Sequence, residues 1–234
     1  MSSAYLLYLE SGPQRKKTLA HVLDLLGCVV QGDTTDQAIA AAPDAIRAYL
    51  RYLARHGEKV DQPTKIETAV AEHNTGGMFS GQALWPQDLK PLTPSALARY
   101  VRWLEWSRAD LLALVKGIDD KALRAKPSKG RSLRDILLHV LDADKSYVYG
   151  LVGPLKTMGE PTNAADRGDL DLHVGLQEAR AAAIARLKKL TPEERARIRK
   201  AGQSTYSAYR VIRRMLEHEW EHRAEIAARL GREA

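Results

Sequence analysis

Four amphipathic segments with helical spacing make up the C-terminal part of the chain, and they constrain the fold more than any other feature. The first begins at Thr93-Pro94, an N-cap residue followed by a proline at the first helical position. Ser132 is placed to cap the second segment, and Asp169 or Asp171 to start the third. These signals predict a four-helix bundle with a long connection between the second and third helices.

The N-terminal part has a different pattern. The runs "AYLLYLES" and "KTLAHVLDLLGCVVQGDT" are short and rich in apolar and β-branched residues, which predicts strands. The segment "DTTDQAIAAAPDAIRAYLRYLARHGE" has helical spacing and stops at Gly57, and we expect Pro43 to bend or split this helix. "TKIETAVAEH" alternates as a further strand would. Strands around one helix predict a small α+β domain.

The stretch "NTGGMFSGQALWPQDLKP" separates the two patterns. It is rich in glycine, proline and polar residues and shows no sustained period, so we interpret it as a linker. The predicted organisation is an α+β domain over residues 1–74, a linker over 75–92 and an all-α four-helix bundle over 93–234. The fold class as a whole is α+β.

Composition excludes several classes of protein. No apolar run approaches the roughly 18 residues that span a bilayer, and the N-terminus lacks a signal-peptide pattern, so we expect a cytoplasmic protein that does not bind membranes. Cys28 is the single cysteine and cannot form an internal disulfide. Residues 93–234 hold 27 Lys and Arg against 19 Asp and Glu, but these alternate at helical spacing. A solvated helix face explains them better than nucleic-acid binding.

Candidate metal ligands occur in the last segment, where "HEWEH" contains His218 and His222. Residues four apart on a helix are offset by about 40° with Cβ atoms about 5–6 Å apart, so both imidazoles can reach one ion. His139 is the candidate third ligand, because it lies on the apolar stripe of the second segment, where a histidine without a partner would lose its hydration. Three histidines would make a catalytic-type zinc site with an open position. Core histidines and chance pairs also produce such spacing, so an ordinary structural role remains open.

The stretch also matches the metalloprotease pattern H-E-x-x-H. Only twelve residues follow His222, and "RAEIAA" stands where the metzincin continuation would be, so we reject a protease. Glu219 then has two interpretations: a base facing the site, or a solvent-exposed residue paired with Arg223, which we favour. Asp142 could orient a ligand or lie on the surface. The other histidines are interpreted as ordinary; they are His21, His56, His73 and His173.

The segments "RSLRDILLHVLDAD" and "RRMLEHEWEHRAEIAARL" resemble the DinB-like superfamily of metal-binding four-helix bundles. The resemblance covers about residues 93–234 and implies a divalent metal on His139, His218 and His222. The usual family text after the last ligand is close to H-R-G-Q-L, whereas this chain has "HRAEI", a difference that touches packing or the outer shell of the site. Characterised relatives include thiol-dependent transferases and isomerases.

The segment "HVLDLLGCVVQGDTTDQAIAAAPDAIRAYLRYLARHGE" resembles the HicB-like antitoxin domain. This family is known for binding a small RNA-cleaving toxin, so the resemblance implies a protein partner. Antitoxins of this kind commonly add a DNA-binding tail, and here the bundle occupies that place. A domain that serves self-association or shields the bundle is an equal alternative.

Together these observations predict a divalent metal, zinc first and otherwise nickel, cobalt, manganese or iron, held by the bundle. The expected function is metal-dependent thiol transfer or hydrolysis of a small molecule, with a small-molecule thiol as one partner. The alternative is a non-enzymatic binding module with a structural metal and a partner-binding HicB-like domain. We also expect a homodimer.

Overall fold

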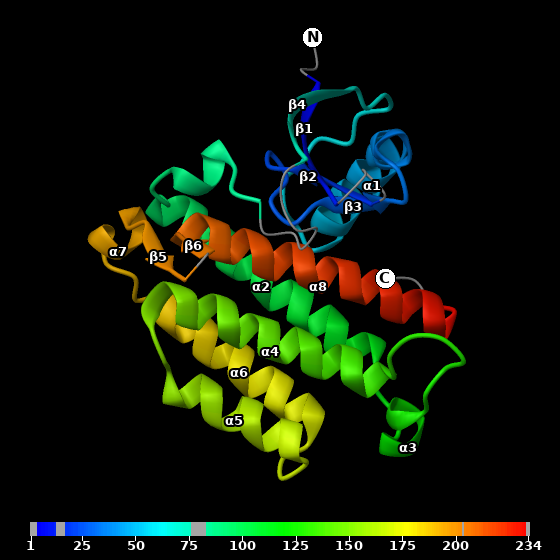
Figure 1. Cartoon of the computed structure of the whole chain (residues 1–234), viewed down its shortest axis with the longest axis vertical. Coiled ribbons are helices and arrows are strands. Elements are labelled where there is room, and N and C mark those ends of the chain that lie inside the picture. The colour runs from blue at the N-terminus through cyan, green and yellow to red at the C-terminus, as the bar shows by residue number, and fades with distance from the viewer. Residues whose placement is uncertain (1–3, 13–16, 76–82, 203, 233–234) are drawn as a thin grey trace. The chain divides into compact units, whose positions relative to one another are not determined.

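The computed structural model divides the chain into two compact units, Met1–Asp88 and Leu89–Ala234 (Figure 1). The structure describes residues 4–12, 17–75, 83–202 and 204–232. Within these ranges, no helix combines the length and the apolar character needed to cross a membrane.

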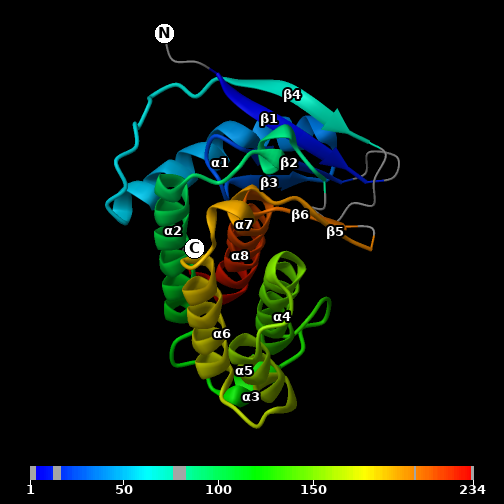
Figure 2. The same ribbon diagram turned by 90° about the vertical axis from the view of Figure 1, so that its left-hand side faces the viewer.

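The first unit is a four-stranded sheet with one long helix. The strands are β1 (Tyr5–Ser11), β2 (Thr18–Val22), β3 (Val29–Gly32) and β4 (Thr68–Asn74), and the helix is α1 (Thr35–Arg55). The strand order is β3-β2-β1-β4, with β1 antiparallel to β2 and parallel to β4. Helix α1 packs against β2 and β3 and covers one face of the sheet (Figure 2). The predicted α+β architecture is therefore confirmed.

Helix α1 begins directly after a tight turn and runs through its internal proline. The side chain of Thr34 accepts a hydrogen bond from the backbone of Gln37 and caps the helix. Gly32 precedes this cap, and a Cβ at that position would lie 2.3 Å from the backbone nitrogen of Ala38, so only glycine fits. The helix continues unbroken past Pro43, so the alternative of a split helix is wrong. Pro43 removes one hydrogen-bond donor from the helix, and its side chain is partly exposed.

The residues just before the second unit fold back onto the sheet. The backbone nitrogen of Ala83 donates to Glu10 of β1 at 3.0 Å, and that of Trp85 donates to Asp88 at 3.0 Å. Trp85 is fully buried against Leu23 and therefore contributes to the core of the first unit. The described end of the predicted linker, from Ala83 on, is therefore structured, and the buried ring of Trp85 contributes apolar contacts there.

The second unit is a four-helix bundle with ordered connections. The bundle helices are α2 (Pro94–Leu114), α4 (Leu133–Val152), α6 (Leu172–Leu187) and α8 (Ala208–Leu230). The connecting elements are α3 (Asp120–Arg124), α5 (Lys156–Arg167), α7 (Pro192–Ala196) and the hairpin of β5 (Arg199–Ala201) and β6 (Ser204–Tyr206). Both α2 and α4 pack against α6 and α8, which closes the bundle (Figures 1 and 2).

Local capping explains where the helices start. Thr93, Ser132 and Asp171 each accept a backbone hydrogen bond as N-caps, which confirms those predicted starts. Thr191 caps α7 in the same way. Gly231 ends α8 in a left-handed conformation with φ of 61°. Helix α5 was not predicted, because its sequence "KTMGEPTNAADR" contains a glycine and a proline, both poor helix formers.

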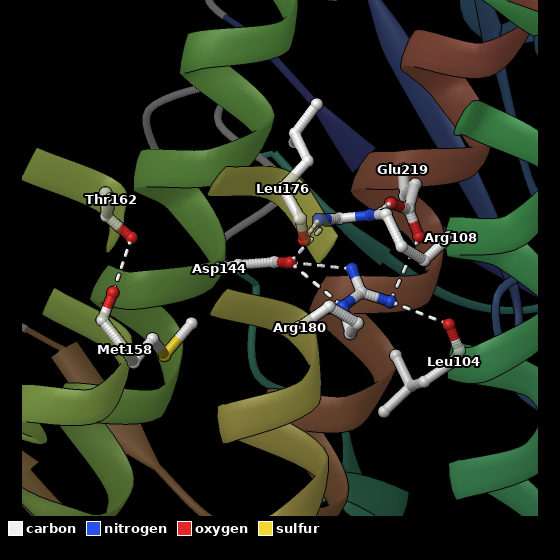
Figure 3. Close-up of polar contacts among 8 residues, drawn as sticks. All are labelled: Leu104, Arg108, Asp144, Met158, Thr162, Leu176, Arg180 and Glu219. Atoms are coloured by element: carbon white, nitrogen blue, oxygen red, sulfur yellow. Dashed lines mark hydrogen bonds and ion pairs between the residues drawn. The ribbon is translucent and has the colours of Figure 1, made fainter. Parts of the chain in front are cut away.

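A cluster of four buried charges joins the four bundle helices (Figure 3). The cluster, called here the charge cluster, consists of Arg108 of α2, Asp144 of α4, Arg180 of α6 and Glu219 of α8. Arg108 contacts Asp144 at 2.8 Å and Glu219 at 2.6 Å. Arg180 contacts the same two acids at 2.6 and 3.1 Å. Two positive and two negative groups therefore compensate one another inside the bundle.

The charge cluster should dominate the stability of the bundle. Asp144→Ala would leave two buried guanidinium groups with one acid, and removing one partner of a buried ion pair costs about 3–5 kcal/mol. We expect a loss of that size in the free energy of unfolding, measured by urea denaturation. The matched control is Asp142→Ala on the same helix, because its side chain is 64% exposed and pairs only at the surface with Lys145. This control should change stability by less than about 1 kcal/mol. Equal losses in the two variants would contradict this role of the charge cluster.

Candidate metal centre

The candidate site lies between two antiparallel helices, α4 and α8. His139 is in the second turn of α4, and His218 and His222 are one turn apart in the central part of α8. Arg229 near the end of α8 donates to the backbone oxygen of Arg131 just before α4, which places these helix ends together. The antiparallel arrangement thus brings the one histidine opposite the pair.

The three imidazoles converge on one point. The Nε2 atoms of His139 and His218 lie 3.0 Å apart. Ring centroids are separated by 4.7 Å for His139 and His218, 5.1 Å for His139 and His222, and 4.5 Å for His218 and His222. Each ring offers one nitrogen, and these three atoms lie within 4.8 Å of one another. No other such group of three histidine, cysteine or acidic side chains occurs in the described ranges.

Exposure differs among the three rings. His218 is buried, His222 is half-buried and His139 is exposed, although its position next to the apolar stripe suggested burial. His139 is therefore the most accessible of the three rings, and His218 is the least accessible.

The surroundings of the histidines keep them neutral. Burial lowers the pKa of His218 to about 2, and His222 and Arg214 add to this effect. Burial also lowers the pKa of His139, together with Arg131. For His222, burial lowers the pKa more than the nearby Glu225 raises it. Neutral imidazoles present lone pairs, as metal ligands must.

The donor set fits a divalent metal ion. Two Nε2 atoms facing each other at 3.0 Å can share at most one proton, whereas a cation would use both lone pairs. Three neutral imidazoles suit zinc and its first-row neighbours. The Nδ1 atom of His218 is buried and has no hydrogen-bond partner within the described residues. The polar atoms of this ring are therefore not fully satisfied by contacts with the protein.

Glu219 differs from both sequence interpretations. It is fully buried in the charge cluster, where Arg108 and Arg180 contact its two carboxylate oxygens. Burial alone would raise the pKa of Glu219, but the two guanidinium groups outweigh it and lower the pKa. The expected solvent-exposed pair with Arg223 is therefore wrong, and Arg223 instead contacts Asp110 at 3.2 Å. A carboxylate held by two arginines in the interior is also poorly placed to act as a catalytic base.

Glu225 contacts the candidate ligand His222, and the sequence interpretation missed this acid. Asp142, the residue considered for this role, is exposed and pairs with Lys145 at 2.8 Å. Glu225 instead lies 2.9 Å from the Nδ1 atom of His222. The signal was present in the sequence, because an acid three residues after a histidine lies on the same helix face.

The remaining histidines lie outside this group. His173 is 3.3 Å from the backbone oxygen of Val115, and the other three belong to the first unit. His21 is buried beside Glu10 in the sheet, in agreement with an ordinary structural role.

Taken with the fold, the site defines a two-domain protein, an α+β unit followed by an all-α bundle with a histidine triad. A family model for the DinB superfamily matches residues 103–226, and one described as HicB_like antitoxin of bacterial toxin-antitoxin system matches residues 5–132. The chain belongs to the DinB superfamily and carries a HicB-like antitoxin domain, as the sequence resemblances indicated. The HicB-like match extends beyond the first unit, and it overlaps the DinB match over residues 103–132. Searches of curated proteins and of solved structures found no match.

The lowered pKa of His218 predicts a pH dependence of stability in the metal-free protein. In the unfolded chain this ring titrates near 6.5, whereas in the folded chain its pKa is about 2. The unfolded state therefore binds more protons between these values, and the free energy of unfolding falls as the pH falls through this window. We expect the urea midpoint to decrease from about pH 7 to about pH 5. His218→Asn should show a smaller decrease, and identical pH profiles would contradict the assignment.

Proposed function

We propose that the second unit binds one divalent metal ion, zinc in the first place, through His139, His218 and His222. The protein would then be a metal-dependent thiol transferase or hydrolase that acts on a small molecule. The observation that carries this proposal is the convergence of three neutral imidazoles from α4 and α8. Membership of the DinB superfamily supports it.

The residues of the chain have separable tasks in this proposal. The charge cluster holds α4 and α8 in the register that brings the triad together. Burial of His218 keeps its lone pair unprotonated, and exposure of His139 leaves one side accessible. A divalent ion held by these three histidines would supply Lewis-acid polarisation of a small-molecule thiol or of water.

Metal content tests the proposed ligands. The purified protein should contain close to one metal ion per chain, measured by elemental analysis after gel filtration, and the His218→Ala, His222→Ala double variant should contain almost none. His173→Ala is the control, because this histidine lies in the same unit but outside the triad. Equal metal in the unchanged protein and the double variant would end the proposal.

Cobalt substitution tests the thiol reaction. If a thiol reaches the metal, adding a small thiol to the Co²⁺-loaded protein should produce a thiolate charge-transfer band and shift the visible bands of the ion. The same addition to the metal-free protein is the control. A spectrum that does not change with any thiol would remove thiol transfer and leave hydrolysis or a structural metal.

The alternative proposal is a binding module without catalysis. The HicB-like match favours it, since that family description names a toxin-antitoxin system. In this alternative the first unit binds a protein partner, and β4 offers an edge, because β1 is its only neighbour among the described strands. The metal would then only join α4 to α8. Zinc that raises the melting temperature, with no exchange of thiol or water at the ion, would favour this alternative. The expected homodimer remains a prediction, tested by light scattering.

A further inference from the structure

Glu225 forms the closest contact between an acid and a proposed metal ligand. Its Oε2 atom lies 2.9 Å from Nδ1 of His222, one turn earlier on α8. An ionised carboxylate can only accept a hydrogen bond, so Nδ1 of His222 must carry the proton. The proton of the neutral ring is then on Nδ1, and the lone pair is on Nε2. One contact therefore decides which nitrogen this ring can offer to a metal.

Glu225 is itself held in place by two arginines. Arg229 donates to its Oε1 atom at 2.6 Å, and Arg131 lies 3.6 Å from its Oε2 atom. Arg229 also donates to the backbone oxygen of Arg131, just before the N-cap of α4. The acid is thus part of a connection between α8 and the start of the helix that carries His139. Its contacts come from α8 and from the residue just before the N-cap of α4.

The other acid near the triad has no such contact. Asp142 follows His139 by three residues on α4, but its carboxylate is 64% exposed and pairs with Lys145. Both acids place a negative charge near the triad. They differ because Glu225 also accepts a hydrogen bond from the ring of His222. This difference provides a matched pair for experiment.

We propose that Glu225 is a positioning residue that fixes His222 in the Nδ1-protonated tautomer and adds a negative charge to the metal centre. This inference rests on the proposed metal function. A carboxylate behind a ligating histidine orients the ring and makes it a better donor, and losing such a partner typically weakens metal binding 10- to 100-fold.

Three variants separate the parts of this role. Glu225→Ala removes hydrogen bond and charge, Glu225→Gln keeps an acceptor oxygen without the charge, and Asp142→Asn removes a nearby charge without touching a ring. Zinc affinity is measured on the full chain by competition with a chromophoric chelator. We expect Glu225→Ala to lose about 10- to 100-fold, Glu225→Gln to lose less, and Asp142→Asn to change affinity by less than about twofold.

The tautomer is observed directly by two-bond ¹H–¹⁵N correlation spectra of metal-free protein labelled at histidine. The unchanged protein and Glu225→Gln should show His222 protonated on Nδ1, and Glu225→Ala should show mixed protonation. A purely structural role would not change this signature. The melting temperature of each metal-free variant identifies any loss of folding, and Glu225→Gln preserves the shape of the side chain if the alanine variant is unstable.

The outcomes distinguish this role from the metal centre itself. If the unchanged protein binds zinc and Glu225→Ala binds it as tightly as Asp142→Asn, the role of Glu225 is overturned while the metal centre stands. A His222 that keeps the same tautomer in Glu225→Ala also overturns it. If the unchanged protein binds no zinc, the proposed function fails, and this role fails with it.

Discussion

The charge cluster is the interaction on which the rest of the bundle depends. Each of its four members comes from a different helix, and all are almost fully buried, so each charge requires its partners in one particular register. Glu219 is the neighbour of His218 in sequence, and Asp144 follows His139 by five residues. The contacts that hold these acids therefore also fix the positions from which the imidazoles project. A shift of either helix by one turn would break the ion pairs and separate the rings.

The polar groups of the bundle change in character from the interior to the surface. In the interior the members of the charge cluster pair with one another and are not part of the histidine triad. At the α4–α8 contact the polar groups become neutral imidazoles, with burial decreasing from His218 to His222 to His139. At the helix ends the arginines hold Glu225 against His222. The buried charges of the interior thus support the histidine triad at the α4–α8 contact.

Local signals in the sequence were sufficient for much of this structure. N-caps such as Ser132 define helix starts through contacts with residues three positions away, so they can be predicted without knowledge of the fold. The separation of His218 and His222 by one helical turn is equally local. The placement of His139 opposite them depended on the bundle topology, which the four amphipathic segments predicted and the family resemblance supported.

Contacts between distant segments could not be predicted. Glu219 had a plausible local partner in Arg223, but its actual partners Arg108 and Arg180 are on other helices, and nothing in their spacing identifies them. Similarly, the Gly- and Pro-rich pattern around Trp85 predicted a linker, because composition does not show that the tryptophan ring is buried in the first unit. In both cases burial against residues distant in the sequence determined the local structure, and local propensity did not.

The central claim is that imidazoles from α4 and α8 share one metal ion. Anomalous diffraction from crystals of the zinc-loaded protein, collected on both sides of the zinc absorption edge, tests it most directly. The account predicts one strong peak per chain within about 2.0–2.2 Å of a ring nitrogen of each of His139, His218 and His222. Zinc bound elsewhere, or a peak that contacts only the two histidines of α8, would contradict it.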